Sequence, residues 1–197
     1  MDDQQIRTSF HSKWLRKHHG DSKTVVINEL GLNHGKSRAD IAIINGRLIG
    51  YEIKSDLDSL RRLNEQVVSY NAIFDRNYII VTERHLKNIE TVLPEWWGII
   101  LAYEGKRCAI HFKNIRKSKV NFTVDDYAVT KLLWRPEAQE ILSTLGVRGK
   151  QGRENRDNLY CYIVSRMNSV ELRRTVRYYL IKRTNWRCHS PPFPSDG

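Results

Sequence analysis

The chain contains 197 residues with a mass of 23.2 kDa, enough for one sizeable domain and a small appendage. Hydrophobic residues make up 40% and aromatic residues 10%, which favours a packed core over extensive disorder. Lys and Arg number 33 against 22 Asp and Glu, and the net charge of +11 favours a polyanionic partner, first of all nucleic acid. The three cysteines form no CxxC pair, which argues against a disulfide framework and a structural zinc site.

The sequence carries no signal-peptide pattern and no apolar run near the ~18 residues of a membrane span. We therefore expect a cytoplasmic protein that does not enter membranes. The charge is unevenly distributed: residues 1–104 hold 14 basic and 14 acidic side chains, whereas residues 105–197 hold 19 and 8. This asymmetry predicts a neutral part that carries chemistry and a basic part that binds nucleic acid, although a merely solvated basic face would give the same counts.

The first 120 residues alternate between helical and strand patterns. Apolar residues four apart, Ile6, Phe10 and Trp14, predict an amphipathic helix, and Asn45-Gly46 between two apolar runs predicts a β-hairpin. The expected elements in chain order are a helix at 3–18, strands at 24–30, 39–44 and 47–55, a helix at 58–74, a strand at 77–82, a helix at 86–93, and strands at 97–103 and 107–112. This order predicts an α/β fold with a mixed central sheet flanked by helices.

After residue 123 the pattern becomes helical throughout. Pro136 opens one helix and Gly146 ends it, and Asn168 with Glu171 has the spacing of a capping box that opens the last helix. The expected helices cover 125–134, 136–146, 154–167 and 168–183. We therefore expect a core at 1–120, a basic helical region at 121–184 and a flexible tail at 185–197.

The hairpin holds the residues most typical of an active site. Glu52 and Lys54 are two apart in a strand, so they share a face, and charges inside such an apolar strand are costly unless they pair or meet a metal. A two-residue turn would place Asp40 opposite Tyr51. A three-residue loop, or a bulge at Gly46 or Gly50, would instead place Asp40 opposite Glu52 with Cβ atoms roughly 4.5–5.5 Å apart.

Two carboxylates held this close repel each other unless a cation lies between them. Hard oxygen ligands suit Mg²⁺ or Mn²⁺, so Asp40 and Glu52 are candidate metal ligands, with the Ile53 carbonyl as a third oxygen. Such an ion can activate water and orient a phosphodiester, and Lys54 can stabilise the charge that develops. The alternative is a cross-strand ion pair without chemistry.

The sequence Asp40…Glu52-Ile53-Lys54 resembles the D…(D/E)xK signature of the PD-(D/E)xK nuclease superfamily, with Ala39 where the superfamily's name has Pro. The resemblance implies a restriction-endonuclease-like core and Mg²⁺- or Mn²⁺-dependent hydrolysis of phosphodiester bonds. Residues 27–75 also resemble a small bacterial and phage branch that is known by a locus-tag name and has no assigned function.

The resemblance implies further site residues. Glu29 resembles the additional upstream carboxylate that many members place near the metal, but it could equally be a surface acid at a strand end. Gln66 and Tyr70 resemble the QxxxY element on the following helix. In that role they would contact the site or a substrate phosphate, whereas the alternative is an ordinary pair on one helix face.

Basic residues suitable for nucleic-acid binding occur in two places. Lys36 and Arg38 lie in the loop before the hairpin. Residues 138–167 resemble, as helix, Gly/Lys loop and helix, the SAP-type DNA-binding motif, although a plain helical hairpin would have the same pattern. The phosphate-binding candidates around this loop are Arg148, Lys150, Arg153 and Arg156.

These observations lead to one hypothesis and one rival. The hypothesis is a metal-dependent nuclease of bacterial or phage origin that acts on nucleic acid, with DNA favoured, and that would form a homodimer if it cuts both strands of a duplex. The rival is a catalytically silent module of the same fold that binds nucleic acid or recruits a protein partner.

Overall fold

A six-stranded mixed sheet forms the centre of the computed structural model, which describes residues 1–147 and 154–183. The strands follow one another across the sheet in sequence order. Their bounds are β1 Val25–Leu32, β2 Ser37–Ile44, β3 Leu48–Lys54, β4 Arg76–Val81, β5 Gly98–Glu104 and β6 Ile110–Arg116. Neighbouring strands are antiparallel except for the pairs β3–β4 and β4–β5, which are parallel. The predicted α/β fold with a mixed sheet and flanking helices is therefore confirmed.

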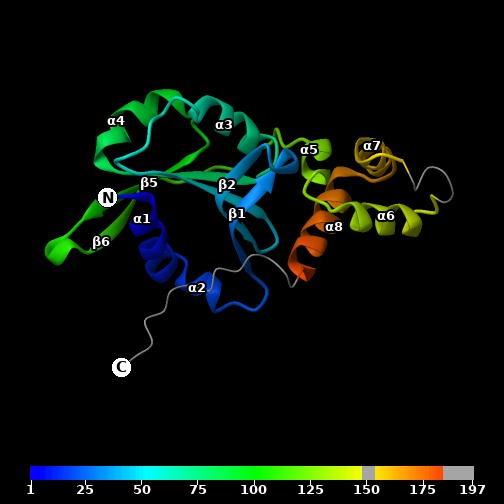
Figure 1. Cartoon of the computed structure of the whole chain (residues 1–197), viewed down its shortest axis with the longest axis horizontal. Coiled ribbons are helices and arrows are strands. Elements are labelled where there is room, and N and C mark those ends of the chain that lie inside the picture. Colours follow the sequence, from blue (N-terminus) through cyan, green and yellow to red (C-terminus); the bar gives the residue numbers. More distant parts are fainter. Residues whose placement is uncertain (148–153, 184–197) are drawn as a thin grey trace.

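Helices cover both faces of the sheet (Figure 1). The N-terminal helices pack against one face through Ile6 and Phe10, whereas helices after β3 and β4 pack against the other through Leu63 and Ile89. The first group consists of α1 Asp3–Ser9, the π-helical segment η1 Phe10–Trp14 and α2 Arg16–His19. The second group consists of α3 Leu63–Asn71 and α4 Glu83–Val92. Short 3₁₀ segments occur at η2 Asn33–Gly35 and η3 Lys106–Cys108. Each face of the sheet thus has its own hydrophobic layer.

The N-terminal helix differs from the continuous helix expected over residues 3–18. A π-helical turn interrupts it, and the N–H of Leu15 bonds to the carbonyl of Phe10, five residues earlier, at 2.9 Å. The wider turn brings Leu15 into the core, where it is fully buried, and leaves Trp14 only half-buried. A stripe of strictly four-residue spacing predicts a regular α-helix and does not indicate this wider turn.

The C-terminal helices belong to the same hydrophobic core as one face of the sheet. They are α5 Asp126–Thr130, α6 Arg135–Thr144, α7 Arg156–Arg166 and α8 Ser169–Lys182. Buried side chains such as Val129 and Leu180 lie in one continuous cluster with Ala42 and Ile79 of the sheet. In Figure 1 these helices gather beside β1, β2 and α3. The boundary expected near residue 120 therefore separates two kinds of secondary structure that share one core.

Two expected helices are shorter in the structure. The helix expected at 58–74 covers only Leu63–Asn71, since residues 58–62 form irregular chain that ends in a turn, and the one expected at 125–134 ends at Thr130. The Asn168 cap is present, with its side chain accepting the N–H of Glu171. The tail expected at 185–197 lies outside the described residues. Across residues 1–147 and 154–183, no helix is both long and apolar enough to cross a bilayer.

Candidate active site

The β2–β3 hairpin has the register that the candidate site requires. Ile44 pairs with Leu48, which leaves a three-residue loop, and Ile41 pairs with Tyr51 farther along. Gly46 in the loop has φ +80°, a conformation that glycine adopts without strain. The odd loop length therefore brings Asp40 to the position opposite Glu52, and the expected parity is confirmed.

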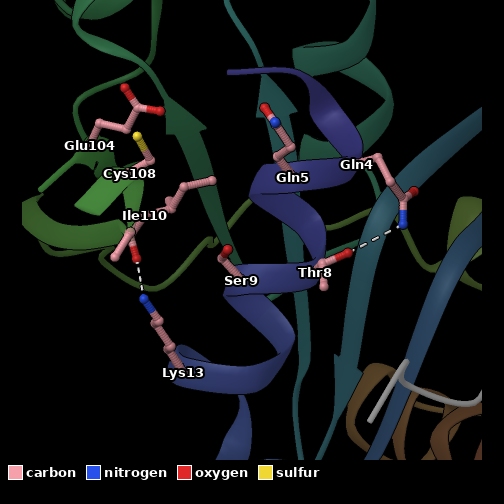
Figure 2. A pocket seen from close by; sticks show the side chains of 9 residues that line it. Gln4, Gln5, Thr8, Ser9, Lys13, Glu104, Cys108 and Ile110 are labelled. Atoms are coloured by element: carbon pink, nitrogen blue, oxygen red, sulfur yellow. Dashed lines mark hydrogen bonds between the residues drawn. The ribbon is translucent and has the colours of Figure 1, made fainter. Parts of the chain in front are cut away.

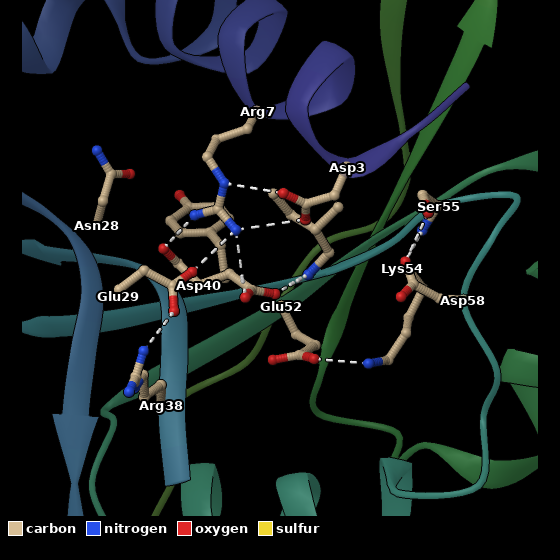
Figure 3. A network of polar contacts seen from close by, with 12 residues as sticks. Asp3, Arg7, Asn28, Glu29, Arg38, Asp40, Glu52, Lys54, Ser55 and Asp58 are labelled. Carbon is tan, nitrogen blue, oxygen red and sulfur yellow. Dashed lines mark hydrogen bonds and ion pairs between the residues drawn. The ribbon is translucent and has the colours of Figure 1, made fainter. Parts of the chain in front are cut away.

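Asp40 lies where the backbone ladder between β2 and β3 ends. Its Oδ2 accepts the N–H of Ile53 at 2.7 Å, so the carboxylate takes the place of a strand carbonyl. Burial raises the pKa of Asp40 to about 7, and the negative charge of Glu52 adds to the increase. Figure 3 shows the two carboxylates on neighbouring strands, in agreement with the register of the hairpin.

Glu52 is almost completely buried, with 1% of its surface exposed. Its Oε1 accepts the Lys54 ammonium at 2.8 Å and the Gln66 amide at 2.5 Å, and its Oε2 accepts the Tyr70 hydroxyl at 2.6 Å. Lys54 is buried as well. A buried carboxylate is stable only when it is paired and hydrogen-bonded, and this network supplies both conditions.

Helix α3 links the two acidic residues through Tyr70. The Tyr70 hydroxyl accepts the N–H of Asp40 at 3.2 Å and donates to Glu52. Burial, together with the charges of Glu52 and Asp40, raises the pKa of Tyr70 well above its ordinary value, so the hydroxyl stays protonated. Because Tyr70 is fully buried, a direct contact with nucleic acid is not open to it, and the expected substrate contact is replaced by contact with the site. The Gln66 side chain likewise points toward Glu52 and donates to its Oε1.

Glu29 lies opposite Asp40 on β1 but does not complete a cage of three acids. Its carboxylate pairs with Arg7 at 3.1 Å and with Arg38 at 3.9 Å. Glu29 also has φ 54°, which is uncommon outside glycine and costs about 1–3 kcal/mol. Among the residues that the structure describes, no three His, Cys, Asp or Glu side chains converge on one point as a metal site. The metal hypothesis therefore depends on Asp40 and Glu52.

Arg7 of α1 is a site residue that the sequence reasoning missed. Its guanidinium reaches the side chains of Asp3, Glu29 and Asp40 (Figure 3). Burial alone would lower the pKa of Arg7, but these three carboxylates together raise it. The spacing of Asp3 and Arg7, four apart on a predicted helix, was the available signal. It indicated a local pair and not a contact with the hairpin.

A cavity of about 600 Å³ opens onto Asp40 and Gln66. It lies between α3 and the connection from β1 to β2, and three exposed cations line it: Lys36, Arg38 and Arg62. A second cavity, of about 460 Å³, lies between α1 and the β5–β6 turn (Figure 2). Among the described residues that line it, Glu104 is the only acidic side chain and Lys13 the only cation. Three acidic side chains, Glu29, Asp40 and Glu65, line the first cavity together with these cations, so charges of both signs meet there.

The basic residues expected between α6 and α7 are only partly described. Arg156 is exposed at the start of α7. The other three candidates of this group, Arg148, Lys150 and Arg153, lie outside the described residues. The structure therefore places Lys36 and Arg38 at the same cavity as Asp40, while most of the second basic cluster stays a prediction.

Comparison with known proteins identifies a family whose model matches most of the chain. Residues 4–190 match the family described as Bacteriophage P4 protein cII. A curated relative, protein cII of Enterobacteria phage P4, is 28% identical over 135 residues, which are 68% of this chain and 51% of the relative. The chain thus spans about half the length of that relative. A solved structure, the SPO1766 protein of unknown function from Silicibacter pomeroyi, is similar with a TM-score of 0.46 and 17% identity, over 76% of this chain and 97% of the other.

Proposed function

We propose that this chain, which belongs to the Bacteriophage P4 protein cII family, is a divalent-metal-dependent nuclease that hydrolyses phosphodiester bonds, with DNA as the favoured substrate. One observation carries the proposal: the hairpin register places Asp40, which lies at the cavity, opposite the buried Glu52, and Lys54 is bonded to Glu52. The PD-(D/E)xK assignment is part of this proposal and depends on the same residues.

The donor set fits Mg²⁺ or Mn²⁺. Magnesium sites use one or two protein carboxylates and complete their six ligands with waters and substrate phosphates. Asp40 and Glu52 supply two such carboxylates, and the Ile53 carbonyl is the candidate third oxygen. The increased pKa of Asp40 supports the fit, because burial and the charge of Glu52 disfavour its ionised form and a nearby cation would relieve this cost. A bound ion would stabilise charge on a phosphate oxygen and lower the pKa of a coordinated water.

The surrounding residues then have separate roles. The Ile53 N–H fixes the orientation of Asp40, and Gln66 and Tyr70 fix that of Glu52. Lys54 places a positive charge beside Glu52, where it can stabilise charge that develops on the phosphate. At the cavity, Lys36, Arg38 and Arg62 attract the backbone of the nucleic acid.

A second candidate function is a silent nucleic-acid-binding module. The observation that favours it is the Arg7 guanidinium, which already neutralises Asp40 together with Glu29 and Asp3. In that case the acidic residues would form a permanent internal ion cluster, and the cations at the cavity would be the functional groups.

An assay with several substrates separates the two functions. The full chain is incubated with plasmid, linear duplex DNA, single-stranded DNA and RNA, each with Mg²⁺, Mn²⁺ or EDTA. The proposal expects cleavage with metal and none with EDTA. Binding without cleavage under every condition would favour the silent module.

A further inference from the structure

Arg7 contacts the candidate site with every nitrogen of its guanidinium. Nη1 donates to the backbone carbonyl of Asp40 at 2.6 Å, and Nε donates to Asp3 at 3.1 Å. Nη2 lies 3.1 Å from Glu29 Oε1, 3.3 Å from Asp40 Oδ1 and 3.3 Å from a second Asp3 oxygen. A single side chain of α1 thus bridges the N-terminal helix, β1 and β2.

The position of Arg7 is fixed by the packing of its helix. Ile6 and Phe10, on either side of it in the sequence, are fully buried against the sheet, and only 14% of the Arg7 side chain is exposed. A guanidinium does not lose its proton in proteins. The positive charge beside Asp40 is therefore permanent in this arrangement.

We propose that Arg7 is the resident counter-ion of the metal site: it holds Asp40 in the metal-free protein, and a divalent ion must compete with it for the same carboxylate oxygen. This inference depends on the proposed metal-dependent function. Asp40 Oδ2 accepts the Ile53 N–H and Oδ1 accepts an N–H of Arg7; each oxygen keeps a second lone pair, so an ion that binds at Oδ1 would lie directly beside the guanidinium. Two cations at one oxygen repel each other, and the repulsion is strong where burial limits screening by water.

The contacts of Arg7 allow this exchange without unfolding of α1. Only the bond to Asp40 Oδ1 has to be given up, because the bonds to the Asp40 carbonyl, Asp3 and Glu29 do not use that oxygen. Arg7 would then remain beside the site as a positioning residue for the strand that carries Asp40. Its presence weakens metal binding and at the same time holds the site together when no metal is bound.

The test measures Mg²⁺ affinity by titration calorimetry at pH 8.5, where the Asp40 carboxylate is ionised in the wild-type chain. Arg7→Gln is compared with Lys13→Gln, which removes the same charge from the adjoining segment η1; within the described part of the chain, the Lys13 ammonium bonds to the carbonyl of Ile110 and to none of the site carboxylates. We expect Arg7→Gln to bind Mg²⁺ about tenfold more tightly, an order of magnitude for the loss of one partly buried competing charge. Lys13→Gln should keep the wild-type affinity.

Equal or weaker binding by a folded Arg7→Gln variant would overturn the competition and leave the metal site standing. If neither wild type nor any variant binds Mg²⁺, the metal-dependent function fails, and the competition fails with it. The double variant Arg7→Gln with Asp40→Asn should lose the higher Mg²⁺ affinity expected of Arg7→Gln alone. If the double variant still binds more tightly than wild type, Asp40 is not the residue for which Arg7 and the ion compete. Should Arg7→Gln not fold, Arg7→Met, which is also uncharged and keeps an apolar stem against the helix, takes its place with the same expected gain, and unchanged affinity would count against the proposal.

Discussion

The N–H of Ile53 donates to Asp40 Oδ2 at 2.7 Å, across the two strands of the hairpin. A side chain here replaces the strand carbonyl that would normally accept this bond, at the point where pairing of β2 and β3 ends. The bond locks the Asp40 carboxylate beside the strand that carries Glu52. It therefore couples the register of the hairpin to the geometry of the proposed metal site.

The increased pKa of Asp40 predicts a specific dependence of stability on pH. The folded-state pKa is about 7 against an ordinary value of 3.8 for Asp, so the folded state binds more protons than the unfolded state between these values. The free energy of unfolding should therefore decrease as pH rises from about 4 to 7, by at most about 4 kcal/mol. Asp40→Asn should lack this contribution. Urea denaturation at pH 4, 5.5 and 7 measures it, and parallel curves for the two proteins would contradict the prediction.

Tyr70→Phe should destabilise the fold more than the same substitution at an equally buried tyrosine. The change removes the donor to Glu52 Oε2 and the acceptor of the Asp40 N–H, and the expected loss is about 2–3 kcal/mol. Tyr160→Phe is the control, because Tyr160 is also fully buried and its hydroxyl has a single hydrogen-bond partner among the described residues, the carbonyl of Leu133. Its expected loss is about 1 kcal/mol. Urea denaturation decides, and equal losses would show that Tyr70 does not support the site.

Lys54 and Glu52 should behave as a coupled pair in a double-mutant cycle. Lys54→Met leaves a buried carboxylate without its cation, so it should cost about 3–5 kcal/mol of stability. Glu52→Gln combined with Lys54→Met should cost clearly less than the sum of the two single changes. Thermal and urea unfolding of the four proteins give the coupling energy. Additive losses would mean that the ion pair contributes nothing to the folded state.

The cations at the cavity should carry part of the affinity for DNA. Lys36, Arg38 and Arg62 line the cavity. Changing all three to Gln should make the slope of log K for DNA binding against log salt concentration less negative by up to about 2.7, because each phosphate contact contributes about −0.9 to this slope. The matched control changes three exposed lysines that do not line the cavity, Lys87, Lys113 and Lys182. Fluorescence anisotropy with a duplex at several salt concentrations measures both. Equal slopes for the two triple variants would remove the cavity from the binding surface.

The sequence was sufficient to predict those parts of the site that depend on strand periodicity. Side chains two apart share a face of a strand, so Glu52 and Lys54 could be placed together, and the parity of the loop at Gly46 decided whether Asp40 opposes Glu52. Helical spacing likewise placed Gln66 and Tyr70 on one face of α3. It could not say that this face turns inward, since that depends on how α3 packs on the sheet.

Arg7 could not be predicted, because its role arises from tertiary packing. The helix that carries it crosses the sheet face at a position set by Ile6, Phe10 and the π-helical turn to Leu15. None of these contacts leaves a pattern in the sequence beyond ordinary amphipathicity. The shared core of the sheet and the C-terminal helices was missed for a similar reason, since apolar periodicity shows which face of a helix is buried and not against what.

The most direct test of the metal-dependent nuclease is the comparison of wild type with Asp40→Asn on supercoiled plasmid in Mg²⁺. Asparagine keeps an oxygen for the Ile53 N–H, so the hairpin should stay folded, and circular dichroism checks this. We predict that wild type nicks or linearises the plasmid only with the metal and that Asp40→Asn loses at least about 10²-fold of the rate. Cleavage by Asp40→Asn at the wild-type rate, or cleavage by both proteins in EDTA, would contradict the account.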